Sequence, residues 1–534
     1  MKDTVKCILG HIVDPVSKKI FDGEITVSDG RIAEIRSAQV SAGASYIMPG
    51  FVDSHVHIES SMMLPAEFAR ICLRHGTVAA VCDPHEIANV LGEDGIELML
   101  DNARSVPFHF AFGVPSCVPS CGGEIETCGC VLDSKAVARL LKRSEFRHLS
   151  EMMNYPGVLG GDPEVLAKLE AAREAGKPVD GHAPGLTGES RRAYARAGIS
   201  TDHECSTIEE GRDAIAAGMK ILIREGSAAK NFEALSPLIA EAPGRVMLCT
   251  DDSHPTDIIG GHINRLVKRA LAAGYPLMDV LTAACVAPVR HYNLPVGLLQ
   301  EGDSADFICV SDLTPEMLIL STCIAGEMLE DLQTPDFEVL PVHNICNAAP
   351  VSAGDLKVSP AAAQHIITVA DGSLLTGDEP FAEGADIQKV VCYNRYTPGA
   401  RPVAAYIRGF GMKRGAFAQT IAHDCHNIVA VGTDDALLAD VINRLIAMKG
   451  GIVATDGTRT DQLQLPVAGL ISPLPVEDLA QKNRELEEVV RASGCSMNAP
   501  FITLGFMSLP VIPALKLTDR GLFDSASIHI TRIS

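Results

Sequence analysis

The stretch that decides the fold of this chain is Ile47-Met-Pro-Gly-Phe-Val-Asp-Ser-His-Val-His-Ile-Glu59. Its apolar residues predict a buried strand over 47–57 that ends in a His-x-His pair. Residues i and i+2 of a strand point to the same face, so the rings of His55 and His57 can converge on one point. Imidazole is the commonest metal-ligating side chain. The pair predicts a metal site only if further ligands follow later strands, because one such triplet is a weak signal.

The sequence from Ile47 to about residue 287 alternates short apolar strands with helical segments. Prolines stand where helices would begin and glycines where they would end. About eight strand–helix units in roughly 240 residues predict a (β/α)8 barrel of the TIM type, an α/β fold. An open doubly wound sheet is the alternative, but no G-x-G-x-x-G motif follows an early strand. The predicted strands are 47–57, 77–83, 107–114, 147–153, 178–182, 199–203, 219–224 and 245–251.

The predicted strand ends carry many histidine and carboxylate side chains. In a barrel of this kind the catalytic site lies at the C-terminal ends of the strands. Asp83 ends the second strand, and His85 lies just beyond it. Strands one, four, five, six and eight end in candidate metal ligands, a pattern that chance rarely produces. These candidates are His55, His57, Glu151, His182, His203 and Asp251.

Several motifs in this region are similar to those of one known family. They are His55-Val-His-Ile-Glu-Ser-Ser61, Cys82-Asp-Pro-His-Glu-Ile-Ala-Asn89, Glu151-Met-Met-Asn-Tyr-Pro-Gly157, Gly181-His-Ala-Pro-Gly185 and Thr250-Asp-Asp252. They resemble the bacterial adenine deaminase family of the amidohydrolase superfamily. The similarity continues through residues 409–415 and 422–427, and so covers nearly the whole chain. Cys425 departs from the pattern, which has a serine there.

The resemblance implies a binuclear metal centre. Two divalent ions about 3.5–4 Å apart can activate a shared hydroxide at neutral pH. By the resemblance, His55, His57 and Asp251 hold one ion, His182 and His203 hold the other, and Glu151 bridges them. Related enzymes that hydrolyse cyclic amides usually bridge with a carboxylated lysine, but segment 147–153 contains no lysine. Mixed histidine and carboxylate ligands suit zinc, manganese and iron, and the resemblance implies manganese or ferrous iron.

The implied reaction is hydrolytic deamination of adenine to hypoxanthine and ammonia. Asp251 would accept the hydroxide proton and pass it toward the departing amine. Glu59 and His85 are alternative acids for a ring nitrogen, although Glu59 could instead orient a ligand and His85 could simply open a helix. Ser60 and Asp83 are candidate substrate-binding residues, and Ser60 could instead cap the next helix.

Two other functions compete with this one. The same metal centre could act on another aminopurine or on a cyclic amide. A barrel without activity could also serve as a binding scaffold, but scaffolds derived from enzymes usually lose ligands, and here the full set is present. Because fold alone does not imply function, the ligands decide in favour of an enzyme.

The flanks of the barrel predict two further units. Residues 1–46 and 288–346 contain short strands that together predict a small β-sandwich. Residues 347–534 predict a C-terminal α+β domain, with strands at 390–393, 403–407 and 428–431 and a helix at 434–448 capped by Thr433. His423, Asp424 and His426 either face the barrel mouth or form a structural hydrogen-bonded cluster.

Composition restricts the partners. A net charge of −22 disfavours nucleic acid and anionic membranes as partners. The resemblance implies a small-molecule purine base as the partner. No apolar run reaches the roughly 18 residues of a membrane span, and the N-terminus lacks the apolar core of a signal peptide. Sixteen cysteines then predict reduced thiols in the cytoplasm. The cluster Cys117–Cys130 fits zinc spacing poorly, which favours free or redox-sensitive thiols. Enzymes of this size often form symmetric homo-oligomers, here a dimer.

Overall fold

Eight parallel strands form the central part of the molecule. The computed structural model describes residues 6–121, 123–329, 332–384, 386–525, 527 and 529–532. Five strands pair in sequence order in one sheet and three in another. Isolated parallel bridges, Val56 with Asp251 and Val179 with Ile199, join the two sheets at both seams. The α/β fold predicted from the sequence is confirmed. The strands are β5 (Phe51–Val56), β6 (Thr77–Cys82), β7 (His109–Val114), β8 (Phe146–Met152), β9 (Val179–Gly181), β10 (Thr201–Asp202), β11 (Lys220–Arg224) and β12 (Val246–Cys249).

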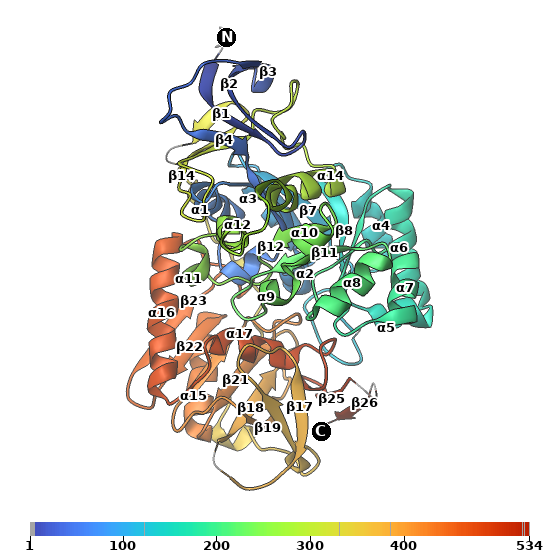
Figure 1. The fold of residues 1–534 in the computed structure, drawn as a ribbon. Helices are drawn as coiled ribbons and strands as arrows, with labels where there is room; N and C mark the ends of the chain where they lie inside the picture. Colours follow the sequence, from blue (N-terminus) through green and yellow to red (C-terminus); the bar gives the residue numbers. More distant parts are fainter. Residues whose placement is uncertain are drawn as a thin grey trace.

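Helices cover the outer face of these strands (Figure 1). The strands are buried almost throughout, as expected where parallel strands have packed residues on both faces. Pro65 and Pro163 occupy the first turn of their helices, as the sequence predicts. Asp162 and Thr207 cap two of the helices through their side-chain oxygens. The larger helices are α1 (Pro65–Arg74), α2 (His85–Leu91), α3 (Glu93–Ala103), α4 (Ser134–Leu141), α6 (Pro163–Glu174), α7 (Gly188–Arg196), α8 (Ile208–Ala216) and α12 (Ile263–Ala272).

The prediction of one continuous strand over 47–57 is wrong. The segment splits into β4 (Tyr46–Pro49), which pairs with β1 and β13, and β5, which pairs with β6. Gly50 separates them, and a Cβ there would lie 2.3 Å from Val78 Cγ1. Only glycine therefore lets the chain pass this close to β6 while it changes sheets. Most of the predicted strands also extend one or two residues beyond the observed ones at one or both ends.

The two flanks of the barrel join in one sheet at the top of Figure 1. The seven strands run in the order β15-β14-β13-β4-β1-β2-β3, so residues from both flanks combine as predicted. Strands far apart in this order approach each other, because Lys6 pairs with Glu327 and Arg31 bridges to Ser304. The β-sandwich stays a prediction. Ile12, Ile25, Ile47 and Phe307 of these strands lie in one core. The strands are β1 (Lys6–Asp14), β2 (Lys19–Ser28), β3 (Arg31–Ser37), β13 (Phe307–Val310), β14 (Ile319–Ile324) and β15 (Glu327–Leu329).

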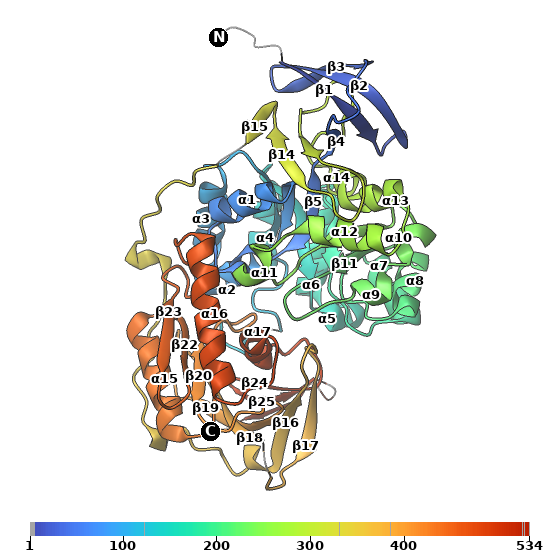
Figure 2. The same cartoon turned by 60° about the vertical axis from the view of Figure 1, so that its left-hand side comes forward.

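The C-terminal part packs against the opposite end of the barrel from that sheet, as Figure 2 shows. An eight-stranded sheet has the order β17-β16-β19-β18-β21-β20-β22-β23. Asp434 caps helix α15 (Asp435–Met448), because its side chain accepts hydrogen bonds from two backbone N–H groups. The predicted cap, Thr433, is wrong by one residue. Asp accepts these bonds as well as Thr does. The strands are β16 (His365–Val369), β17 (Thr376–Pro380), β18 (Ile387–Tyr393), β19 (Val403–Arg408), β20 (Ala416–Gln419), β21 (Ile428–Gly432), β22 (Gly451–Thr455) and β23 (Thr460–Gln464).

Helix α16 (Val476–Ala492) runs from the C-terminal part along the side of the barrel, beside α11 (Pro255–Ile258). Val476 N donates to Glu67 Oε1 of α1, and Arg70 of α1 pairs with Glu477 of α16. The chain ends in a small sheet of β24 (Leu515–Thr518), β25 (Gly521–Asp524) and β26 (His529–Arg532). Over the described residues, no helix combines the length and apolarity needed to cross a membrane.

Candidate metal centre

The six predicted ligands meet at the C-terminal ends of the strands, and each is at most 5% exposed. Three of them form a first group. His57 Nε2 lies 3.3 Å from Asp251 Oδ1, and His55 Nε2 lies 3.6 Å from the same oxygen. The His55 and His57 rings meet edge to face with centroids 4.8 Å apart. The i and i+2 spacing thus brings both imidazoles to one carboxylate.

Glu151 connects this first group to a second one. Its Oε1 lies 3.3 Å from His57 Nε2. Its Oε2 lies 2.9 Å from His182 Nδ1 and 3.2 Å from His203 Nε2. Each oxygen of this one carboxylate therefore faces a different set of histidines, which is the arrangement that a bridging ligand requires.

The residues present fit a pair of divalent ions. His55, His57 and Asp251 each offer a ligand atom, and these three atoms lie within 4.8 Å of one another. His55, Glu151 and His203 meet the same criterion. His55 Nε2 is buried and has no hydrogen-bond partner among the described residues. A buried imidazole nitrogen without a partner is costly, and a bound cation would satisfy it.

A buried arginine sets the charge state of the site. Arg224 Nη1 lies 2.5 Å from Glu204 Oε1 and 2.8 Å from Asp251 Oδ2. Burial alone raises the pKa of Asp251, but Arg224 and then His57 outweigh it and hold that pKa well below its ordinary value. Burial likewise raises the pKa of Glu151, and His182 reverses the shift. Both carboxylates are therefore anionic and ready to bind a cation.

Sequence reasoning missed Arg224 and Glu204. Arg224 is the last residue of the predicted strand 219–224, and Glu204 directly follows the ligand His203. The rule that found the ligands, which reads each strand end in turn, would have found both. Arg224 is neither a histidine nor a carboxylate, and Glu204 lies one residue beyond its predicted strand.

The remaining predicted residues surround the ligands. Glu59, in the short helix Ile58–Ser61, accepts from Ile87 N at 3.1 Å, and burial raises the pKa of its carboxyl to about 7. Ser60 Oγ donates to Asp252 Oδ1 at 2.5 Å. Asp83 Oδ2 lies 3.1 Å from His85 Nδ1.

His85 is the one of these four that lines the cavity beside the ligands. Its Nδ1 also lies 3.7 Å from Glu151 Oε1. Glu59, Ser60 and Asp83 instead contact residues around the cavity. His85 is therefore the predicted proton donor best placed to reach a bound molecule.

Comparison with known proteins agrees with this geometry. The Amidohydrolase family matches residues 46–329, and the Adenine deaminase C-terminal domain matches residues 365–528. A protein of Salinibacter ruber named adenine deaminase is 49% identical over 98% of both chains. The chain belongs to the adenine deaminase family. Adenine deaminases of Parabacteroides distasonis, 46% identical over 98% of both chains, and of Methanosarcina mazei, 48% identical over 97% of this chain and 98% of that one, are also similar.

A solved structure of N-acetyl-D-glucosamine-6-phosphate deacetylase from Mycobacterium smegmatis aligns with a TM-score of 0.47 at 18% identity. The alignment covers 60% of this chain and 99% of that chain.

The adenine deaminase C-terminal domain completes the site. The cavity over the ligands is lined from that domain by Leu374, His423, Asp424, Phe506 and Leu509. His423 Nδ1 and His426 Nε2 hydrogen-bond to the two oxygens of Glu86, the first-turn carboxylate of α2. The sequence left open whether His423, Asp424 and His426 face the barrel mouth or form a structural hydrogen-bonded cluster. In the structure His423 and Asp424 line the cavity. His423 and His426 are also hydrogen-bonded to Glu86.

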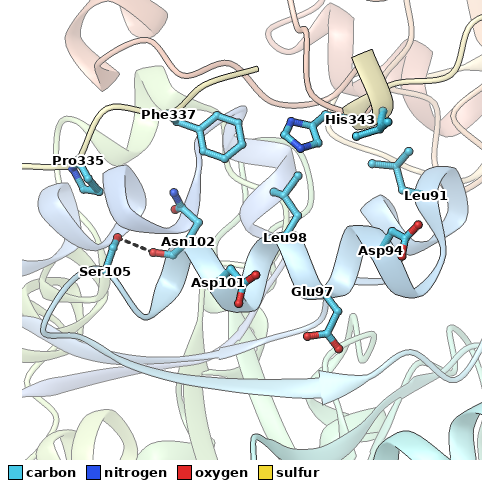
Figure 3. Close-up of a pocket in the computed structure, with 11 residues that line it drawn as sticks. Leu91, Asp94, Glu97, Leu98, Asp101, Asn102, Ser105, Pro335, Phe337 and His343 are labelled. Atoms are coloured by element: carbon cyan, nitrogen blue, oxygen red, sulfur yellow. Dashed lines mark hydrogen bonds between the residues drawn. The ribbon is translucent and has the colours of Figure 1, made fainter. Parts of the chain in front are cut away.

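A second hollow lies on the outside of the barrel, away from the strand ends (Figure 3). Helix α3 forms one wall of this hollow with Asp94, Glu97 and Asp101. The segment between β15 and β16 forms the other wall with Phe337 and His343. The Asn102 carbonyl accepts from Ser105 Oγ at its floor. The carboxylates of this hollow all lie on one face of α3. Its lining therefore differs from that of the candidate metal centre, which is buried and rich in histidine.

The cysteine-rich loop lies between the barrel and the C-terminal domain. Thr127 Oγ1 donates to Asp519 Oδ2 at 2.6 Å, and Asn427 Nδ2 donates to Thr127 O at 2.9 Å. Cys128 Sγ donates to Cys130 O at 2.6 Å. All sixteen cysteines of the chain are free thiols in the structure. The loop therefore makes its interdomain contacts through threonine and backbone groups.

Proposed function

We propose that this protein catalyses the hydrolytic deamination of adenine to hypoxanthine and ammonia. The observation that carries the proposal is the position of Glu151, with one oxygen toward each histidine group. Similarity to proteins named adenine deaminase over the full length, C-terminal domain included, supports adenine as the substrate over another aminopurine or a cyclic amide.

The ligand set accommodates two divalent ions, with manganese or ferrous iron preferred and zinc as the alternative. His55, His57 and Asp251 would hold one ion, His182 and His203 the other, and Glu151 both. When bound there, the ions would lower the pKa of water and so supply hydroxide at neutral pH.

The protein's own residues move the protons. Asp251, kept anionic by Arg224, accepts the proton that the attacking water loses and passes it toward the departing amine. Attack at C6 builds negative charge on the ring, so a ring nitrogen must be protonated. His85 lines the cavity and is the better placed acid. Glu59 is the alternative, because burial raises the pKa of its carboxyl to about 7.

Ammonia release from adenine tests the proposal directly. Protein loaded separately with manganese, ferrous iron and zinc is assayed on adenine, adenosine, guanine and dihydroorotate. Release from adenine alone, with a clear metal preference, supports both the substrate and the metal. Two bound ions without release from adenine would refute the substrate, and release from dihydroorotate would assign the centre to cyclic amides.

The larger organisation is part of the same proposal. We assign residues 50–287 to a closed (β/α)8 barrel, residues 1–49 with 288–346 to the flanking β unit, and residues 347–534 to the C-terminal domain. The first boundary lies three residues later than the sequence predicts, because β4 pairs with strands of the flanking unit. We further propose a symmetric dimer in the cytoplasm. Light scattering on the purified protein measures the mass of the assembly and tests the dimer.

A further inference from the structure

Residues 422–427 of the C-terminal domain form a rigid loop over the metal centre. His423 and His426 each hydrogen-bond to a different oxygen of Glu86, so this barrel residue holds the loop at two points. The backbone carbonyls of the loop are also held. Ser508 Oγ donates to His423 O at 3.3 Å, Tyr396 OH donates to Cys425 O at 2.6 Å, and Arg395 Nε donates to His426 O at 2.5 Å.

Two residues of the loop, His423 and Asp424, line the cavity, and His423 is already bonded to Glu86. The Asp424 side chain is buried, and Oδ1 lies 3.5 Å from His85 Nε2. Its Oδ2 is buried and has no hydrogen-bond partner among the described residues. Buried carboxylate oxygens are almost always hydrogen-bonded, because leaving one without a partner is costly. An oxygen held in this position by a rigid loop is suited to accept a hydrogen bond from a bound molecule.

The rest of the cavity combines a small apolar surface with many polar groups. Met153, Leu374, Phe506 and Leu509 contribute the apolar surface. Its polar lining comprises five of the six metal ligands, Asp424, and also His85, Glu86, Glu204, Arg224, Asp252 and His423. The Phe506 ring is itself stacked on His423, with centroids 4.3 Å apart and planes at 17°, so its orientation is fixed. A ligand that places an electrophilic carbon at the metal centre and an N–H donor elsewhere on its rim satisfies both kinds of polar group.

We propose that Asp424 accepts a hydrogen bond from the imidazole N–H of the bound purine and thereby selects the free base over its 9-substituted forms. The inference deepens the proposed function and depends on it. A 9-substituted purine has no imidazole N–H, so it leaves the buried carboxylate without a partner and adds bulk beside it. Sites built to bond a substrate N–H reject analogues that lack it by roughly 10⁴-fold.

The test compares adenine with 9-methyladenine in the full-length, manganese-loaded protein. Wild-type enzyme, Asp424→Asn and Asp424→Ala are assayed for kcat and KM on both bases, with bound metal counted in parallel. Asp440→Asn is the matched control, because the Asp440 side chain is about half exposed on α15, where it pairs with Arg444 at 2.8 Å.

The expected result is a change in selectivity without loss of metal. Wild-type enzyme should prefer adenine by at least about 10³-fold, and both Asp424 variants should reduce this preference below about 30-fold. Their kcat/KM on adenine should fall about 100-fold, mainly through KM, while two ions remain bound. Asp440→Asn should match wild type. The preference is a ratio measured on one preparation, so a partly unfolded variant does not distort it.

Three results would overturn the inference. An Asp424→Asn enzyme that keeps the wild-type preference would show that Asp424 does not bond the N–H. A variant that loses an ion would make Asp424 a metal ligand instead. A wild-type enzyme that accepts both bases equally would show that the site has no such selectivity. Wild-type protein with two ions and no activity on adenine would instead refute the proposed function itself.

Discussion

Arg224 Nη1 lies 2.8 Å from Asp251 Oδ2, and both side chains are buried at the ends of neighbouring strands. The contact leaves Asp251 Oδ1 free to face His55 and His57. Arg224 also pairs with Glu204, so one guanidinium contacts two carboxylates beside the candidate metal centre. The arginine thus orients the residue that we propose to be the catalytic base.

Replacing this arginine should damage both stability and turnover. In chelator-treated protein, Arg224→Met deprives two buried carboxylates of their arginine partner and should lower the free energy of unfolding by about 3–5 kcal/mol. In the manganese-loaded enzyme, kcat should fall at least about 100-fold, because Asp251 loses its orientation. Urea unfolding and ammonia release measure the two effects.

Arg212→Met is the control for this change. Arg212 pairs with Glu241 at 2.8 Å, but both side chains are about half exposed, so its loss should cost under about 0.5 kcal/mol. Equal losses in the two variants would contradict the role given to Arg224.

Glu151→Gln should remove metal and activity together. An amide carries no charge and presents a single acceptor oxygen, so it cannot serve both histidine groups. Metal analysis after gel filtration should find no more than one ion per chain, against two in the wild type. Glu170→Gln, at an exposed helix position, should keep both ions. Two ions in Glu151→Gln would exclude a bridging role.

The proton donor can be identified by comparing two variants. His85→Asn should lower kcat by about 10²–10⁴ with both ions retained, the usual effect of losing a general acid, because His85 lines the cavity. Glu59→Gln should lower kcat less than about tenfold, since its carboxyl bonds Ile87 N behind the cavity wall. The test measures kcat and bound metal for both variants. A larger loss of kcat in Glu59→Gln than in His85→Asn would identify Glu59 as the acid.

The stability of the protein should rise with pH above neutrality because of one buried lysine. Burial lowers the pKa of Lys516 from 10.5 to about 7, while its ammonium donates to Leu374 O and Phe506 O. Between these two values the unfolded chain binds a proton that the folded protein lacks. This group should therefore add about 1.4 kcal/mol of stability per pH unit over that window.

Lys516→Met should remove that contribution. The test is the free energy of unfolding of both proteins at several pH values between 7 and 10, with the slopes compared. A shallower slope in Lys516→Met is expected, and identical slopes would show that Lys516 stays protonated in the fold.

Much of the candidate site could be predicted because local patterns carry it. The His-x-His spacing places His55 and His57 together at one strand end, and both do contact Asp251. The same strand-end rule led to Glu151, whose contacts reach residues far along the chain. The predicted strand boundaries were wrong by a few residues. At Gly50, close packing against Val78 divides the predicted strand 47–57 into β4 and β5.

The contacts of the C-terminal domain could not be predicted in this way. Glu86 and His426 are 340 residues apart, and no local periodicity relates them. Arg224 could have been chosen by its position, but its two carboxylate partners depend on how neighbouring strands are registered.

The sequence by itself determined the alternation of strands and helices, the ligand types and their places at strand ends, because these follow from periodicity and turn chemistry along the chain. Only the tertiary structure decided which cation pairs with Asp251, and that Asp424 of a distant domain lies over the centre. Those relations depend on packing between segments far apart in sequence, where distance and burial, and not spacing along the chain, set each interaction.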